Sequence, residues 1–110
     1  MVKRKGLSTT MYICFAEYKI AAGERDAYLA YVHALMKESG QNVQIYEGTD
    51  QINLFVEIWT AATEEEAEAI KKERCDERSS WYRVAEWIPG GADKMHVWTF
   101  KPAGAGLNAG

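Results

Sequence analysis

Residues 43–60 read VQIYEGTDQINLFVEIWT, two runs of β-branched and aromatic residues on either side of the polar segment GTDQ at 48–51. Such runs favour extended strands, and the polar segment between them is typical of a tight connection. The stretch therefore predicts a β-hairpin with strands at 43–47 and 52–60.

The predicted hairpin has two unlike faces. A four-residue loop would place Ile45 opposite Leu54 and Val43 opposite Val56, so that the aliphatic residues of both strands share one face. The other face of the second strand is aromatic and polar, and its members are Asn53, Phe55, Glu57 and Trp59.

The elements on either side of the hairpin follow from apolar periodicity and from capping residues. We expect a strand at 11–20, a helix at about 24–38, a second helix at about 64–78, a short helix at 81–87 and a last strand at 94–101. The order is βαββαβ, which predicts a ferredoxin-like α+β fold with a four-stranded antiparallel sheet and both helices on one face. We expect a single domain at 11–101, between a flexible leader at 1–10 and a flexible tail at 102–110.

Charge and composition exclude several classes of function. The 110 residues carry a formal net charge of -3, and three of the 13 basic residues lie within the first ten positions. An acidic body disfavours nucleic acid. No apolar run is long enough for a membrane span or a signal peptide, so we expect a cytoplasmic protein. Cys14 and Cys75 match no zinc spacing, so we expect free thiols and no metal site.

A four-stranded sheet with both helices on one face leaves its other face uncovered. In this sequence both faces of the hairpin are rich in apolar side chains, so neither face is suited to water. We therefore expect a homodimer in which the sheets of two copies pack against each other.

One segment resembles a known family. The sequence FVEIW at 55–59, followed by an acidic helix start and Ala67, is similar to the E-x-W signature of the dimeric α+β barrel proteins typified by antibiotic biosynthesis monooxygenases and their haem-degrading relatives. The resemblance covers roughly residues 11–101. It implies two sheets packed into a barrel at a dimer interface, filled by Leu54, Val56 and Ile58. It also implies a ligand pocket between sheet and helices, and the residues that would point into it are Asn53, Phe55, Glu57 and Trp59.

The same resemblance bears on cofactors. Haem-degrading members use a histidine on the second helix and an asparagine on the first strand, together with a tryptophan for which Trp59 is the counterpart. Residues 64–78 contain no histidine and residues 11–20 contain no asparagine. We therefore predict no cofactor and disfavour haem.

Three further residues are candidates for chemistry on their own account. Glu57 lies mid-strand among aromatic residues, so it is either a general base with a raised pKa or the partner of Arg74 or Lys19 in an ion pair. Arg74 lies on the inward stripe of the second helix, where it either pairs with Glu57 or holds the carboxylate or phenolate of a ligand. His96 shares a strand face with Trp98 and is either a proton acceptor or a structural residue.

The aromatic residues of 81–98 have two interpretations. Trp81, Val84 and Trp87 recur at every third position, so they either form a plug over the end of the sheet or belong to a lid that closes a pocket. On the second interpretation Trp87 and Trp98 are pocket walls.

The sequence thus favours a homodimeric protein that binds a small hydrophobic or aromatic molecule. A stronger form of this hypothesis is a cofactor-independent monooxygenase acting on such a compound. The alternatives are a non-catalytic stress-response or interaction domain and, in third place, a haem-binding protein.

Overall fold

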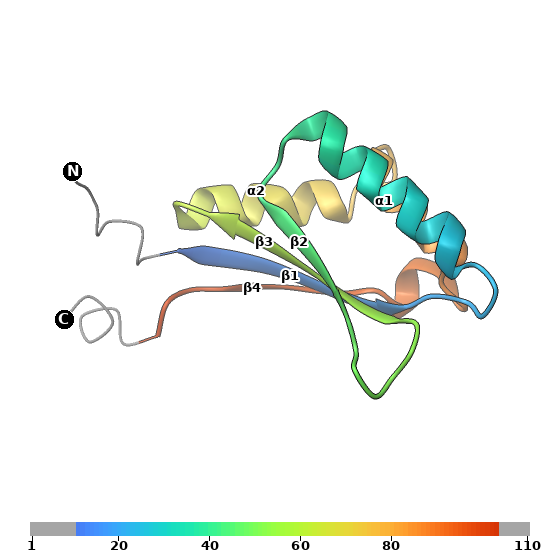
Figure 1. The fold of residues 1–110 in the computed structure, drawn as a ribbon. Coiled ribbons are helices and arrows are strands. Elements are labelled where there is room, and N and C mark those ends of the chain that lie inside the picture. The colour runs from blue at the N-terminus through green and yellow to red at the C-terminus, as the bar shows by residue number, and fades with distance from the viewer. Residues whose placement is uncertain (1–10, 104–110) are drawn as a thin grey trace.

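The computed structural model describes residues 11–103, which form a four-stranded antiparallel sheet with both α-helices on one of its faces (Figure 1). The expected leader at 1–10 and residues 104–110 of the expected tail lie outside the described part. The elements are β1 (Tyr12–Lys19), α1 (Arg25–Ser39), β2 (Val43–Glu47), β3 (Leu54–Ala61), α2 (Glu64–Arg74), the 3-10 helices η2 (Ser80–Trp87) and η3 (Gly91–Lys94), and β4 (His96–Phe100).

The strand order in the sheet is β2-β3-β1-β4, so β1 and β3 are the central strands. This order and the position of the helices confirm the predicted ferredoxin-like α+β fold. The short helix expected before the last strand is η2, and η3 is an additional turn that the sequence did not indicate. Within residues 11–103 no helix is long and apolar enough to cross a membrane.

The predicted register of the hairpin was wrong. Val43 pairs with Trp59 and Ile45 with Glu57, which is a shift of three residues from the expected pairing. Strand β3 begins at Leu54 rather than at residue 52, because the loop extends to Asn53, whose φ of 74° turns the chain. Since the shift is odd, Val43 and Ile45 move to the helix-facing side of the sheet.

The helix termini explain the lengths of α1 and α2. Gly40 ends α1 in the left-handed conformation, with φ of 65°. Thr63 caps α2 by accepting a hydrogen bond from the backbone N–H of Glu66 at 3.1 Å. Helix α2 ends at Arg74, four residues earlier than expected, and Asp76 then accepts a hydrogen bond from the backbone N–H of Arg78. Arg78 is therefore not on the inward stripe of the helix.

The hydrophobic core lies between the helix-facing side of the sheet and the helical segments. Each central strand alternates buried with half-buried residues, as expected of a sheet with one covered face. The buried side chains of the core are Cys14, Ala16, Tyr18, Ile20, Tyr28, Val32, Val43, Phe55, Trp59, Trp81, Val84 and Ile88.

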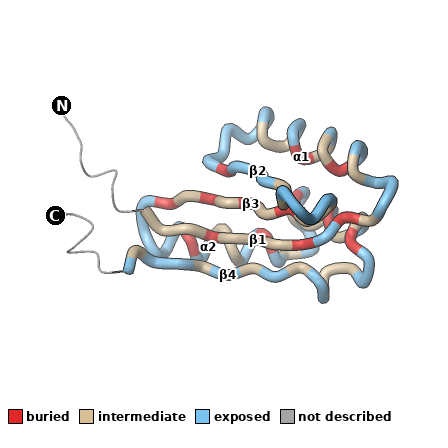
Figure 2. The backbone as a smooth tube through the Cα atoms, turned by 60° about the horizontal axis from the view of Figure 1, so that its bottom comes forward, coloured by how far each residue is buried: buried red, intermediate tan, exposed pale blue. Residues whose placement is uncertain are grey.

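The opposite side of the sheet, called the open face below, is covered by no element among the described residues. Its apolar residues include Ile13, Phe15, Leu54, Val56, Ile58, Trp98 and Phe100, and its polar residues include Glu17, Lys19, Gln44, Tyr46, Thr60 and His96. Trp98 is 45% exposed and Phe100 is 51% exposed, and β4 has no buried residue along its length (Figure 2). The open face therefore carries an accessible aromatic surface.

Candidate functional site

The helix-facing side of the sheet holds a group of hydrogen-bonded side chains, called the polar core cluster below. Its members are Tyr18, Tyr28, Glu57, Trp59 and Arg74. They come from β1, α1, β3 and α2, so the cluster joins both helices to the two central strands. Glu57 has no exposed side-chain surface and Arg74 has 1%.

The carboxylate of Glu57 is the centre of this cluster. Its Oε1 accepts hydrogen bonds from Arg74 Nε at 2.7 Å and from Trp59 Nε1 at 2.8 Å. Its Oε2 accepts from Arg74 Nη2 at 2.6 Å and from the Tyr18 hydroxyl at 2.5 Å. These four bonds occupy the lone pairs of the carboxylate, and the bidentate geometry is the strongest that an arginine offers. Glu57 thus forms an ion pair with Arg74, which is one of the two interpretations of Glu57 in the sequence analysis.

Two tyrosine hydroxyls extend the network away from Glu57. Tyr18 uses its only hydrogen on Glu57, so the 2.7 Å contact with Tyr28 has the Tyr28 hydroxyl as donor. Burial, followed by the nearby Glu57 charge, raises the pKa of Tyr18 well above its usual value. Burial likewise raises the pKa of Tyr28. Both phenols therefore stay protonated and serve as donors at neutral pH.

Arg74 is packed on all sides but has one nitrogen unbonded. Its guanidinium carbon lies 5.6 Å from the ring centre of Trp81 and 6.0 Å from that of Tyr18, within the range of cation–π contacts. Burial acts to lower the pKa of Arg74, and the attraction and hydrogen bonds of Glu57 raise it above its usual value. The Nη1 atom is buried without a hydrogen-bond partner among the described residues.

The space beside Arg74 is small. A void of about 10 Å³ is bordered by Trp59, Ile70, Glu73, Arg74 and Trp81. A volume of this size holds about one water molecule and is far too small for an aromatic substrate or a haem. The rings of Trp59 and Trp81 meet at 4.8 Å, and Trp81 is only 4% exposed. The region in which the resemblance implied a ligand pocket is thus closed by protein side chains.

The η2 segment has the contacts of a plug. Because a 3-10 helix has three residues per turn, Trp81, Val84 and Trp87 line up along one side of it. Trp81 and Val84 are buried in the core, while the ring of Trp87 packs against Tyr31 at 5.4 Å. The Trp87 carbonyl also accepts a hydrogen bond from the backbone N–H of Ala21 at 2.8 Å, which ties the segment to the end of β1.

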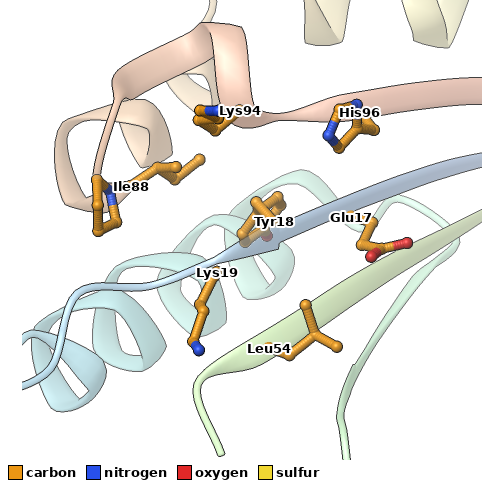
Figure 3. A pocket seen from close by; sticks show the side chains of 8 residues that line it. Glu17, Tyr18, Lys19, Leu54, Ile88, Lys94 and His96 are labelled. Atoms are coloured by element: carbon orange, nitrogen blue, oxygen red, sulfur yellow. The ribbon is translucent and has the colours of Figure 1, made fainter. Parts of the chain in front are cut away.

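A larger hollow lies on the other side of the sheet, at the end where β1 finishes and β3 and β4 begin (Figure 3). We call it the sheet-end cleft, and its volume is about 300 Å³. Its ionisable side chains are Glu17, Lys19, Lys94 and His96, and its remaining lining residues are Tyr18, Leu54, Ile88 and Pro89. Glu17 and His96 are directly opposite each other on β1 and β4.

The solved structures that resemble this chain share its fold at low sequence identity. A putative antibiotic biosynthesis monooxygenase from Nitrosomonas europaea matches with a TM-score of 0.60 and 13% identity, over 86% of this chain and 91% of that one. A NIPSNAP family protein from Agrobacterium tumefaciens matches with a TM-score of 0.59 and 14% identity, over 86% and 94% of the two chains. The chain has the antibiotic biosynthesis monooxygenase-like fold.

A conserved protein from Methanosarcina mazei Go1 has this fold as well, with a TM-score of 0.62 and 10% identity over 86% of this chain and 95% of that one. A scan against models of protein families and a search of curated proteins both find no match. The likeness therefore establishes the fold, and the resemblance predicted from FVEIW at 55–59 is confirmed at that level.

Within this fold the predicted site residues fall into separate regions. Phe55, Glu57 and Trp59 face the helices as expected, and Arg74 meets Glu57 there. His96 and Trp98 lie on the open face, where their rings stack at 5.8 Å and 11°. Neither residue can line a cavity with Glu57, because the register of β4 against β1 places both on the opposite side of the sheet from Glu57.

The two remaining predicted residues have structural contacts. Asn53 lies in the β2–β3 loop, where its backbone N–H donates to Glu47 at 2.9 Å and its carbonyl accepts from Ile20 at 2.8 Å. Trp87 lies against α1 rather than in either hollow.

Sequence reasoning missed both tyrosines of the polar core cluster and most of the sheet-end cleft. Tyr18 could have been found from strand alternation. It lies on the same side of β1 as the small apolar residues Cys14 and Ala16, so its hydroxyl needs a buried partner. The cleft had no signal in the sequence, since its lining depends on the β1–β4 register and on the path of the chain after η2.

Proposed function

We propose that this chain is a homodimeric protein that binds a small hydrophobic or aromatic molecule in the sheet-end cleft. The observation that carries the proposal is the contrast between the two hollows. The void between sheet and helices is about 10 Å³, whereas the cleft beside the open face is about 300 Å³ and combines apolar walls with several ionisable groups. Ligand pockets in proteins have this size and this mixture of side chains.

The dimer is supported by the nature of the open face. Phe15 packs against Trp98 at 5.9 Å and against Phe100 at 6.1 Å, so aromatic side chains from adjacent strands form a continuous surface. Apolar patches of this kind are rarely left in water. A second copy packed on Phe15, Trp98 and Phe100 would leave the cleft at the rim of the interface. The reason is that the cleft is lined by His96 at the start of β4, whereas Phe100 is at the other end of that strand.

The oligomeric state tests the first half of the proposal. Trp98→Glu places a charge in the middle of the aromatic surface and is expected to convert dimer into monomer in sedimentation velocity runs. Ile52→Glu is the matched control, since Ile52 is 70% exposed in the β2–β3 loop and should leave the dimer intact. A wild-type protein that is monomeric at micromolar concentration contradicts the dimer.

Binding tests the second half. A library of small aromatic and aliphatic compounds can be screened by recording changes in the backbone amide signals of NMR spectra. We expect binders that perturb the signals of Leu54, Ile88 and His96. Leu54→Trp fills the cleft and is expected to abolish binding. Ile52→Trp introduces the same side chain two residues away, outside the cleft, and should bind normally. Binders that perturb the residues around Arg74 instead would refute the assignment to the cleft.

The proposal gives Glu57 no catalytic role, because Glu57 has no free lone pair with which to remove a proton from a substrate. The second candidate is a non-catalytic interaction domain, and it is supported by the closed helix-facing side and the exposed aromatic surface. A stable dimer that binds no compound of the library would favour that candidate.

A further inference from the structure

The sheet-end cleft contains ionisable side chains that have no partners. Within residues 11–103, the side chains of Glu17, Lys19, Lys94 and His96 make no hydrogen bond or ion pair. Some charged groups elsewhere on the surface are paired, as in the 2.6 Å contact of Arg25 with Glu47. Unpaired charges that converge on an apolar hollow are typical of a site whose partner is a ligand.

The balance of charge in the cleft is positive, although the chain as a whole is acidic. The two lysines outweigh the single acidic side chain of the lining, Glu17. The chain has a formal net charge of -3, so this local excess runs against the general repulsion of anions. A ligand with one negative charge would balance the cleft, whereas a cation would add to its charge.

The position of Lys94 is fixed by a glycine. Gly90 has φ of 91°, and a Cβ atom at this residue would lie 2.7 Å from Lys94 Cγ. The aliphatic stem of Lys94 therefore rests against the bare backbone of Gly90, close to Ile88 at the edge of the cleft (Figure 3). A lysine whose stem is already packed loses less rotamer freedom when its ammonium group holds an anion.

The apolar part of the lining complements this charge. Leu54 and Ile88 lie on different sides of the hollow, with Lys94 and His96 on the same side as each other and Lys19 across from them (Figure 3). A flat apolar body could contact Leu54 and Ile88 while a group at its end reaches the ammonium of Lys94.

We propose that the sheet-end cleft binds small amphipathic monoanions, with an aromatic body on Leu54 and Ile88 and a carboxylate held by Lys94. This inference rests on the proposed function, which places the ligand in the cleft, and it adds the chemical class of that ligand. It moves the role of anion anchor from Arg74, which is committed to Glu57, to a lysine on the opposite side of the sheet.

Three compounds with one aromatic ring and different end groups test the inference: phenylacetate, its neutral amide phenylacetamide, and the cation phenethylamine. Isothermal titration calorimetry on the full chain is expected to rank the anion first. A charge-assisted hydrogen bond at a partly exposed lysine should make phenylacetate bind about tenfold more tightly than the amide. Raising the salt concentration should reduce that difference.

The variant Lys94→Met keeps the stem over Gly90 and removes the charge, so it is expected to bind phenylacetate and phenylacetamide with equal affinity. Lys72→Met is the matched control, because Lys72 is exposed on α2 and the same charge is lost outside the cleft. It should retain the preference for the anion.

The outcomes separate the inference from the proposed function. If phenylacetamide binds in the cleft as tightly as phenylacetate, or if Lys94→Met keeps the preference, the anion class is overturned while binding in the cleft stands. If none of the three compounds perturbs the NMR signals of Leu54 or Ile88 at millimolar concentration, the proposed function fails and this inference fails with it.

Discussion

Replacing Arg74 by methionine should destabilise the protein strongly, because it leaves the carboxylate of Glu57 buried and without its cation. The side chains of the pair are 1% and 0% exposed, and two hydrogen bonds of 2.6 and 2.7 Å are lost. Removing one partner of a buried ion pair typically costs about 3–5 kcal/mol, and we expect Arg74→Met to lie in that range. Only Tyr18 and Trp59 would remain as donors to the carboxylate.

A second substitution should recover most of this loss. Glu57→Gln in the Arg74→Met background removes the uncompensated charge while keeping a carbonyl acceptor in the same place. The double variant is therefore expected within about 2 kcal/mol of the wild type, so that the two changes are strongly non-additive. The measurement is urea denaturation followed by tryptophan fluorescence at one fixed protein concentration, since a dimer would make stability depend on concentration.

Arg78→Met provides the control, because Arg78 is 88% exposed and its pair with Asp76 is open to solvent. We expect no measurable change in its urea midpoint. The reasoning is refuted if Arg74→Met costs no more than Arg78→Met, or if the double variant is as unstable as Arg74→Met alone.

Three other predictions follow from packing and charge. Burial raises the pKa of the Cys14 thiol to about 12, so a thiol reagent at neutral pH should label the exposed Cys75 in the native protein and both cysteines only after unfolding. Arg25 holds the pKa of Glu47 at about 2, below its ordinary 4.5. The stability advantage of the wild type over Glu47→Gln should therefore be complete above pH 4.5 and shrink as the pH falls towards 2, which urea midpoints across that range would measure. Trp81→Ala should lower the free energy of unfolding by about 3–5 kcal/mol in the same denaturation assay, and a loss below about 1 kcal/mol would contradict its role as a plug.

The inward position of Glu57 is an example of what sequence could predict about the candidate site. In a strand, successive side chains alternate between faces, so the pattern of β3 assigns Phe55, Glu57 and Trp59 to one side whatever the rest of the chain does. The inward stripe of α2 likewise placed Arg74 towards the sheet, and together these patterns made the ion pair one of two interpretations.

The separation of His96 and Trp98 from Glu57 could not be obtained in the same way. Alternation within β4 groups His96 with Trp98 correctly, but it does not say which of the two faces of β4 continues the helix-facing side of β1. That choice depends on the pairing of Glu17 with His96, which is set after the chain has passed through η2 and η3.

The sequence by itself determined the order of the elements, the capping of the helices and the grouping of side chains within each strand, because these depend on residues a few positions apart. Only the tertiary structure decided the register between strands and the location of the hollow. A shift of three residues in the hairpin moved Val43 and Ile45 to the covered face. The filling of the space around Arg74 by Trp81 left a void of only about 10 Å³ there, whereas the sheet-end cleft measures about 300 Å³. Such outcomes depend on loop geometry and on how side chains from distant segments fill volume, and neither is encoded in local periodicity.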